Sequence, residues 1–423
     1  MSRVPPPWIT GLGFVTSIGN DRETVLHSLL TNRSGIEPHR FLEDDRSQVR
    51  AAGTIKEFDL SDPNWATWTL PNRYTLSRKV LRSLPPHGVY ALCAALEAVE
   101  SAGLKPDGLS DPRIGLHCAS AGSTLFVHRF LEEMYRTRGR RGDPLGVSKT
   151  ISGTLNFNLG AYFKIQGANL GFSSACASSS HALAYASEEI RTGRQDALLV
   201  VGAEDLNAET LLPFAALRAL SHREAPGASR PFDLQRDGFV GTGGATAILL
   251  ESRERARKRG ARPYAALRGW GQASDGSDVA ASHPEGRGLA RAIRNALDDA
   301  ALRPGDIAYI NAHATSTQVG DTSEARGIHS VFEPAGSTPP VSSTKGITGH
   351  ALSLSGALEA AISALCLHHQ WVPGNKNLDE IDPECACLNL PTSGYRADLH
   401  TILSNSSGFG GSNVALILER ADP

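Results

Sequence analysis

The sequence lacks any long apolar run, and none of its segments approaches the roughly 20 consecutive apolar residues that cross a bilayer. Its opening letters, MSRVPPPWITGLG, contain no apolar stretch of the kind found in signal peptides. The net charge is only −2, so the chain has no general attraction for nucleic acid or for an acidic membrane surface. We therefore expect a cytoplasmic protein with neither nucleic acid nor a membrane as a partner.

Cysteine is also scarce, with six residues scattered over a chain of 423. Small secreted domains that depend on disulfides carry denser cysteines, so we expect a reduced protein. Cys385 and Cys387 lie close together, but no second Cys/His pair stands at metal-ligand spacing from them. The sequence therefore predicts no metal site.

What the chain does contain is an ordinary globular balance of 40% apolar and 20% charged residues. Short apolar runs bounded by glycine or polar turn residues predict buried strands, although periodicity alone does not exclude buried helices. These runs cover 113–120, 196–205, 244–251, 307–314, 401–406 and 414–419. Segments with one apolar helical face lie among them, at 87–104, 177–193, 288–302 and 354–369. This alternation predicts a layered α/β architecture.

A segment near the start, WITGLGFVTSIG, has an echo in ALRGWGQASDG in the second half of the chain. Both are typical of a strand that runs into a glycine-containing turn, and helix and strand segments follow each of them. The echo indicates a duplicated architecture with a join near residues 252–265. Within the join, SRERARKRGAR is highly charged and predicts a solvent-exposed helix.

Four segments carry residues suited to chemistry, and the first is GFSSACASSSHALAYA. Cys176 lies there between small residues, where a strand-like run gives way to a helix, so the backbone can turn sharply and a substrate can approach closely. A helix start offers unpaired N–H groups and a positive dipole end, which lower the pKa of a thiol and raise its nucleophilic fraction. A buried structural cysteine would fit this segment equally well.

The second and third segments supply histidines. In INAHATSTQVGD, His313 follows a strand-like run, and Thr315 and Thr317 offer hydroxyls to a polar ligand. In VSSTKGITGHALSLSGALEAA, Lys345 and His350 flank a glycine-containing turn before a helix. Lys345 could orient a partner, and His350 could donate a hydrogen bond to an enolate oxygen. Taken singly, each of these positions also fits a structural role.

The fourth segment, SNSSGFGGSNVALILE, is rich in glycine. Gly408, Gly410 and Gly411 free the backbone, so that its N–H groups can point into a pocket. A phosphate-binding loop is the alternative, but the lysine and the Ser/Thr of a P-loop are missing here.

The order of the four segments is more specific than any one of them: ACASS, then NAHATST, then STKGITGH, then NSSGFGG. With ITGLGFVTSIGN near the start and RPFDLQRDGFVGTGGA in the middle, they cover nearly the whole chain. This set resembles the β-ketoacyl-[acyl-carrier-protein] synthases of types I and II, in the thiolase-like superfamily. The resemblance implies a five-layered α-β-α-β-α fold of duplicated halves. Residues 1–257 would carry the nucleophilic cysteine, and residues 258–423 the two histidines and the lysine.

The resemblance also implies an acyltransferase activity. An acyl thioester on Cys176 would undergo decarboxylative Claisen condensation with malonyl-[acyl-carrier protein] to give a 3-oxoacyl-[acyl-carrier protein], in fatty-acid or polyketide/polyene synthesis. His313 and His350 match the histidines that promote malonyl decarboxylation and steady the enolate, and Lys345 matches a lysine that holds the electrostatics of the site. No cofactor is implied beyond the phosphopantetheine of the acyl carrier protein, and the implied assembly is a homodimer.

Other positions match residues of the family that bind substrate. Thr315 and Thr317 match hydroxyls that bind the pantetheine arm, and Phe214 matches an aromatic residue of the acyl pocket. The backbone N–H groups of Cys176 and Phe409 match the oxyanion hole. Phe409 also matches an aromatic residue that gates the pocket.

A further set matches charged residues of the family. Glu359 matches an acidic partner of the lysine region, and Asp321 and Glu324 match acidic residues downstream of the first histidine. Lys79 and Arg82 are similar to a basic strip that contacts the acidic carrier protein, although a solvated surface would also explain them. Three more arginines could extend this strip: Arg138, Arg140 and Arg141.

The sequence departs from the family pattern near the pocket. Ser407 replaces the first Phe of the usual NSFGFGG, ALSLSGA follows TGH where a Leu-Gly-Ala-Ala run is usual, and GTGGA lacks a common acidic residue. These departures leave acyl length and pathway open, and a specialised lipid or polyene pathway is one alternative. A chain-length-factor-like or decarboxylase-only partner subunit is another, but such subunits lose the cysteine that this chain keeps. A thiolase would need a second catalytic cysteine, and DPECACLNL does not resemble an active-site loop.

Overall fold

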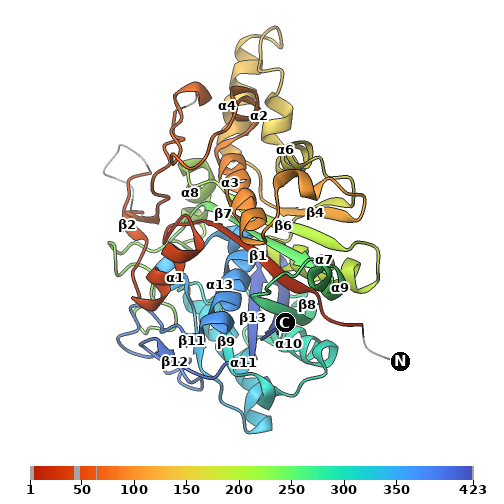
Figure 1. Cartoon of the computed structure of the whole chain (residues 1–423). Helices are drawn as coiled ribbons and strands as arrows, with labels where there is room; N and C mark the ends of the chain where they lie inside the picture. Colours follow the sequence, from red (N-terminus) through yellow and green to blue (C-terminus); the bar gives the residue numbers. More distant parts are fainter. Residues whose placement is uncertain (1–3, 42–47, 63, 422–423) are drawn as a thin grey trace.

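The computed structural model describes residues 4–41, 48–62 and 64–421, and a ten-stranded mixed sheet runs through it (Figure 1). The first half of the chain gives the strand order β5-β4-β6-β7-β1, and the second half gives β10-β9-β13-β14-β8. The strands span Trp8–Val15 (β1), Ile114–Ala119 (β4), Asn169–Phe172 (β5), Ala197–Glu204 (β6), Gly244–Glu251 (β7), Ala265–Ser274 (β8), Tyr309–Asn311 (β9), Val341–Ser342 (β10), Thr401–Gly408 (β13) and Ser412–Glu419 (β14). The strand pairs also have matching directions: antiparallel from β1 through β7 to β6 and from β8 through β14 to β13, then parallel out to each edge. The prediction of duplicated halves is confirmed.

The two half-sheets meet along β1 and β8, which pair through Trp8 with Ala266 and Ile9 with Ala265. These are the strands of the sequence echo, so the echo reflects equivalent positions in the two halves. The shared Gly-X-Gly pattern has a packing reason. A Cβ at Gly13 of β1 would lie 1.9 Å from a carbonyl oxygen of helix α3 (Pro86–Ser101). One at Gly271 of β8 would lie 2.3 Å from a carbonyl oxygen of helix α10 (Arg287–Ala300). Each helix therefore lies directly against the strand backbone.

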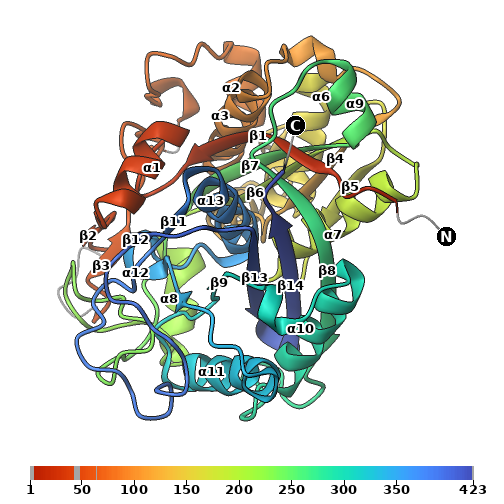
Figure 2. The same ribbon diagram turned by 60° about the horizontal axis from the view of Figure 1, so that its bottom comes forward.

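Helices cover both faces of each half-sheet, which gives five layers. On the outer faces lie α3 (Pro86–Ser101) and α6 (Thr154–Phe163) in the first half, and α10 (Arg287–Ala300) and α11 (Gln318–Phe332) in the second. Between the half-sheets lie α7 (Ser178–Arg191) and α13 (Ser355–His369). Figure 2 shows α3 and α10 on opposite sides of the molecule, with α13 between them. The predicted five-layered α-β-α-β-α fold is confirmed.

Alternation along the strands supplies the cores between these layers, because successive side chains of a strand point to opposite faces. In β6, Leu198 and Val200 pack in the central layer, whereas Leu199 and Val201 pack toward α3. In β14, Val414, Leu416 and Leu418 face the centre, and Ala415 and Ile417 face α10. The near-continuous apolar runs in the sequence thus mark strands buried on both faces.

The remaining elements are short or peripheral. They are α1 (Arg22–Leu30), β2 (Ile36–Pro38), β3 (Ala51–Gly53), α2 (Arg78–Ser83), α4 (Thr124–Arg136), α5 (Gly146–Thr150), α8 (Ala208–Ala216), α9 (Arg253–Lys258), α12 (Lys345–Thr348), β11 (Trp371–Val372), β12 (Tyr395–Arg396) and six short 3₁₀ turns within the described residues. The charged join between the halves forms α9, as predicted. Among the helices of the described residues, none is both long enough and apolar enough to cross a membrane.

Candidate active site

Cys176 lies in a tight turn between β5 and α7. Ala175, just before it, has a left-handed φ of +50°, and the backbone bridge between Ser174 and Cys176 closes the turn. The hydroxyl of Ser178, the first residue of α7, accepts from the N–H of Ser174 at 2.8 Å and donates to the carbonyl of Ala175 at 2.6 Å. Small residues make this turn possible, and it holds the sulfur just ahead of the helix.

The helix that carries Cys176 and the one that follows His350 pack together at their first turns. A Cβ at Gly356, near the start of α13, would lie 2.0 Å from the hydroxyl oxygen of Ser180 in α7. The N–H of Ala357 also donates to the hydroxyl of Ser179 at 2.9 Å. This close packing brings together the two segments that precede the helices, one from each half of the chain.

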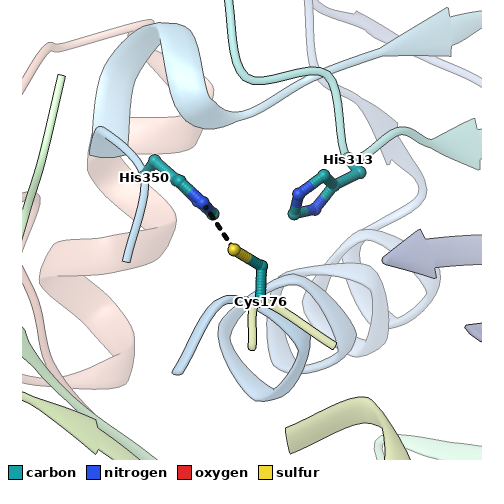
Figure 3. Close-up of side chains that lie close together, drawn as sticks. All are labelled: Cys176, His313 and His350. Carbon is teal, nitrogen blue, oxygen red and sulfur yellow. Dashed lines mark hydrogen bonds between the residues drawn. The ribbon is translucent and has the colours of Figure 1, made fainter. Parts of the chain in front are cut away.

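His350 is the nearest partner of the sulfur among the described histidines: its Nε2 lies 3.2 Å from the Sγ of Cys176 (Figure 3). Its other ring nitrogen, Nδ1, lies 3.0 Å from the hydroxyl oxygen of Ser355. The backbone of His350 is fixed by the segment that contains Val240 and Thr242, through hydrogen bonds of 2.7 Å and 3.0 Å. The mid-chain motif therefore positions this histidine.

His313 follows β9 and faces the same point, as Figure 3 shows. Its ring lies 5.2 Å from the ring of His350, centroid to centroid, at 86°. Its Nδ1 lies 3.3 Å from the Nζ of Lys345, and its backbone N–H donates to Glu324 at 2.7 Å. The sulfur of Cys176, one ring nitrogen of His313 and one ring nitrogen of His350 all lie within 4.8 Å of one another. The sequence prediction that these three side chains meet is therefore in agreement with the geometry.

Behind the histidines lies a buried charged network. Lys345 forms an ion pair with Glu359, and both side chains are almost fully buried. Glu324 accepts a hydrogen bond of 2.7 Å from the side-chain amide of Asn405. Burial raises the pKa of Glu359 and of Glu324 to about 7, while the charge of Lys345 opposes the rise in both. Lys345 is thus placed to set the charge state of its neighbours.

The histidines are neutral in this environment. Burial holds the pKa of both His313 and His350 well below its usual value near 6.5, and the positive charge of Lys345 lowers both further. Cys176, His313 and His350 are close enough together to hold a metal ion, but Lys345 disfavours one. An ammonium group that contacts His313 opposes a divalent cation beside it. The prediction of no metal, which was made from the spacing of the cysteines, stays a prediction.

The thiol does not follow the prediction made for it. Burial raises the pKa of the Cys176 thiol to about 12, although the charge of Lys345 opposes the rise. The expected lowering at the helix start is therefore wrong for the substrate-free site. Cys176 lies two residues before Ser178, where α7 begins, and the effect of burial on its pKa outweighs the lowering by the charge of Lys345. With a pKa of about 12, the thiol keeps its proton at neutral pH in the substrate-free site.

These groups open into a cavity of about 380 Å³. Cys176, His313 and His350 line it together with Thr315 and Thr317. Aromatic side chains close one side: the ring of Phe214 on α8 lies 5.8 Å from that of Phe409 and 5.4 Å from that of Phe239, and Phe239 contacts His350 edge-on at 5.2 Å. The cavity therefore pairs a polar channel with an apolar wall.

Comparisons with known proteins agree with this geometry. The model of "Beta-ketoacyl synthase, N-terminal domain" matches residues 7–256, and the model of "Beta-ketoacyl synthase, C-terminal domain" matches residues 264–379. The chain is 37% identical over 418 residues to 3-oxoacyl-[acyl-carrier-protein] synthase 1 of Escherichia coli (strain K12), covering 97% of this chain and 98% of that protein. The chain belongs to the β-ketoacyl synthase family. It is an acyltransferase-type ketosynthase.

Solved structures extend the likeness of this ketosynthase to the whole fold. A β-ketoacyl synthase from Burkholderia phymatum STM815 superposes with a TM-score of 0.88 at 32% identity, covering 99% of this chain and all of that one. The type II PKS acyl-carrier protein in complex with its ketosynthase, AntDE:AntF, gives a TM-score of 0.85 at 28% identity, with coverage of 99% and 100%.

Three more predicted residues of the ketosynthase lie outside the cavity lining, in two different places. Asp321 accepts hydrogen bonds from the backbone of Thr315, Ser316 and Phe232, and so shapes the loop after His313 rather than lining the cavity. Lys79 and Arg82 lie exposed on α2 and do not line the cavity. The roles given to them from the family resemblance stay predictions.

The glycine-rich loop lies directly against the turn that carries Cys176. A Cβ at Gly408 would lie 2.6 Å from the carbonyl oxygen of Ser174 and 3.2 Å from the backbone nitrogen of Cys176. This contact places Phe409 next to Cys176, as the proposed oxyanion hole requires, although the oxyanion hole itself stays a prediction. Cys385 is buried in the core around α10 and α11, and neither it nor Cys387 lines the cavity, so neither supplies the second thiol of a thiolase site.

Three partners of these groups are not among the residues predicted from the sequence. Asn405, which binds Glu324, stands in the NSSGFGG motif and could have been found there. Phe239, which packs on His350, belongs to the mid-chain motif. Ser355 was noted only as a departure from the family pattern, because its contact with His350 depends on how the chain turns into α13.

Proposed function

We propose that this ketosynthase condenses an acyl thioester, held on Cys176, with malonyl-[acyl-carrier protein] to give a 3-oxoacyl-[acyl-carrier protein] and CO₂. The observation that carries the proposal is the convergence of one thiol and two neutral imidazoles on a cavity with an apolar wall. The family supports fatty-acid or polyketide synthesis as the setting.

In the loading step, the sulfur of Cys176 attacks the thioester carbonyl. The bond from that carbonyl to the pantetheine sulfur breaks, and the thiol proton of Cys176 leaves with the pantetheine thiol. The proton has to move in this step because the resting thiol has a pKa of about 12. Backbone N–H groups of Cys176 and Phe409 would stabilise the oxyanion.

In the condensing step, the malonyl group loses CO₂ and becomes an enolate, whose carbon attacks the acyl group on Cys176. Cys176 leaves as a thiolate and regains a proton from water. An ammonium group has no acceptor, so Lys345 donates to Nδ1 of His313, and the ring proton of His313 lies on Nε2. Neutral N–H donors can stabilise the enolate oxygen without protonating the carbon. The reaction proposed here needs no metal or redox cofactor, since decarboxylation itself creates the carbanion.

We propose an acyl carrier protein as the partner that brings both substrates, and the likeness to AntDE:AntF supports it. Lys79 and Arg82 on α2 are the residues proposed to meet its acidic surface, because both are exposed. Thr315 and Thr317, whose hydroxyls lie 3.1 Å apart in the cavity, would bind the pantetheine arm. A cytoplasmic location accords with these partners and is part of the proposal.

A homodimer is proposed from the edge of the first half-sheet. Strand β5 leaves one edge unpaired within the described residues, and Leu170 on it is 46% exposed. Phe157 on α6 and Tyr185 on α7, two helices that contact β5, are also exposed. An open edge flanked by exposed apolar side chains is suited to pairing with a second copy. Sedimentation equilibrium would test this: a dimer that Leu170→Lys separates supports it, and a wild-type monomer contradicts it.

Loading of Cys176 tests the central claim. Incubation with an acyl-[acyl-carrier protein] should add the mass of one acyl group to the wild-type chain. Cys176→Ala should not gain the acyl mass, and its condensation should fall at least about a thousandfold while some malonyl decarboxylation survives. A wild-type chain that never gains the acyl mass on Cys176 would sink the claim. It would also revive the alternative of a partner subunit that only decarboxylates.

A further inference from the structure

The ring of His350 has a hydrogen-bond partner at each nitrogen. Nε2 faces the sulfur of Cys176 at 3.2 Å, and Nδ1 faces the hydroxyl oxygen of Ser355 at 3.0 Å. Ser355 is the first residue of α13 and is buried. The Leu-Gly-Ala-Ala run described above as usual after TGH contains no hydroxyl, whereas ALSLSGA of this chain contains Ser353 and Ser355.

The hydroxyl of Ser355 has one hydrogen to place. Among the described residues, Nδ1 of His350 is the one hydrogen-bond partner of this oxygen. If Nδ1 carried the ring proton, the hydroxyl would accept from it and its own hydrogen would have no partner. A bare Nδ1 accepts that hydrogen, which is the more favourable of the two arrangements. The ring is neutral, because burial and Lys345 hold its pKa well below the usual value. A neutral ring with a bare Nδ1 carries its single proton on Nε2.

We infer that Ser355 is a positioning residue that holds His350 as the Nε2–H tautomer, with this N–H directed at the sulfur of Cys176 and the substrate oxygen beside it. The inference rests on the proposed condensation and specifies how His350 takes part in it. His350 is then a hydrogen-bond donor at rest and not a base for the thiol proton.

His313 reaches the same tautomer by another route. Lys345 donates to its Nδ1 from 3.3 Å, so its proton also lies on Nε2. One histidine is thus set by a charged donor and the other by a neutral hydroxyl. Loss of the hydroxyl should therefore disturb His350 without changing the charge around His313.

The kinetic test compares two serines of the same segment. Ser355→Ala removes the donor to Nδ1, and kcat for condensation and for malonyl decarboxylation should fall about tenfold with KM for the carrier protein unchanged. Ser353→Ala is the matched control, because the Ser353 hydroxyl is also buried but has no hydrogen-bond partner within the described residues. Its rates should stay at the wild-type level. Ser355→Thr keeps the hydroxyl and should recover most of the rate.

A spectroscopic test reads the tautomer itself. In protein labelled with ¹⁵N-histidine, with His350 assigned by comparison with His350→Asn, wild type should show a protonated Nε2 and a bare Nδ1. Ser355→Ala should show both tautomers in exchange. A protonated Nδ1 in wild type, or an unchanged tautomer in Ser355→Ala, would overturn the inference.

Different results would contradict the proposed condensation and the role of Ser355. A wild-type protein that does not condense contradicts the proposed function, whatever the tautomer of His350. A wild-type protein that condenses while Ser355→Ala matches Ser353→Ala in kcat contradicts only the role of Ser355. Circular dichroism melting curves of the variants would show that each comparison is made between folded proteins.

Discussion

The two halves of the molecule share one strand order but contribute different chemistry. In the first half, the turn after β5 enters α7 and carries Cys176. In the second half, the segment after β10 enters α13 at the equivalent place and carries Lys345 and His350. The ends of the next strands differ in the same way, since β4 runs into Ser120 where β9 runs into His313. One half supplies the sulfur, and the other supplies the groups that hold charge.

This division follows from how α7 and α13 pack. Their first turns touch at Ser180 and Gly356, so the segments that precede them must meet, whatever residues they carry. A duplicated fold of this kind brings two equivalent segments to one point, and each is free to specialise. Mutations should therefore separate the role proposed for Cys176 from the roles proposed for Lys345 and the two histidines.

Strand edges show a second difference between the halves. Strand β10 is buried, and the N–H of Val341 donates to the carbonyl of Asn389 at 2.8 Å, so a loop covers this edge. Strand β5 has no such cover among the described residues, and most of its side chains are exposed. In the part of the chain that the structure describes, it is therefore the first half that offers an open edge to a second copy.

Among the variants that separate the two halves, Lys345→Ala should have the largest effect. It leaves Glu359 buried without its partner and removes the donor to His313, so malonyl decarboxylation should fall about a hundredfold or more. It should also change the pH profile. Lys345 lowers the pKa of both histidines, so without it each pKa moves up toward 6.5. The acid limb of the rate profile, where the neutral rings become protonated, should then shift to higher pH.

A matched control comes from the first half, where Lys149 is also buried and pairs with Asp143 at 2.6 Å. Lys149→Ala breaks a lysine–carboxylate ion pair away from the histidines. The partner Asp143 is exposed, unlike Glu359, so the control matches the loss of a buried ammonium group and not the stranding of a buried carboxylate. Lys149→Ala should leave the pH profile unchanged. The contradicting result is an equal loss of rate in Lys149→Ala and Lys345→Ala, with the acid limb of the pH–rate profile unchanged in both. That result would show that the charge of Lys345 has no special part in the site.

The next effect should separate loading from decarboxylation. His313→Ala and His350→Ala each remove an N–H donor from the enolate site, so each should slow malonyl decarboxylation by about a hundredfold. Acyl transfer to Cys176 should survive in both, because the sulfur comes from the other half. Intact mass and CO₂ release measure the two steps separately. Decarboxylation at the wild-type rate would remove that histidine from the mechanism.

The sequence predicts the backbone of the long elements better than it predicts the contacts of side chains. The apolar runs predicted the long strands, and the GLG and GWG echo predicted the equivalence of β1 and β8, because helices pack on those glycines. Motif order predicted that Cys176, His313 and His350 would meet. Residues 34–86 carry few strong periodic signals, so the sequence predicts no helix or strand there.

Two features of the site could not be predicted from sequence, for different reasons. The pKa of Cys176 depends on how completely the cavity encloses the sulfur, and the helix start alone suggested the wrong direction. The contact between Ser355 and His350 depends on the backbone path into α13. Both are consequences of burial and angle, which spacing along the chain does not specify.

A third effect should test the equivalence of the halves through stability. Gly13→Ala and Gly271→Ala each place a Cβ against a helix carbonyl, at 1.9 Å and 2.3 Å, and should each lower the free energy of unfolding by about 1–3 kcal/mol. Gly108→Ala and Gly305→Ala are matched controls, since a Cβ at either glycine meets open space. Urea unfolding would measure all four. Equal stability across the four variants would contradict the close packing of α3 and α10 on their strands.

The smallest effect is expected at the surface proposed to meet the carrier protein. Lys79→Glu with Arg82→Glu reverses two exposed charges on α2, and KM for the carrier protein should rise by roughly threefold to tenfold at low salt with kcat nearly unchanged. Lys105→Glu is the control. Lys105 is also exposed, but it follows the far end of α3, a helix of 16 residues that is about 24 Å long. Because attraction between exposed charges fades with distance and salt, a rise in KM confined to the α2 variant and lost at high salt would place the carrier protein there. An unchanged KM would reject the basic strip and leave the cavity chemistry intact.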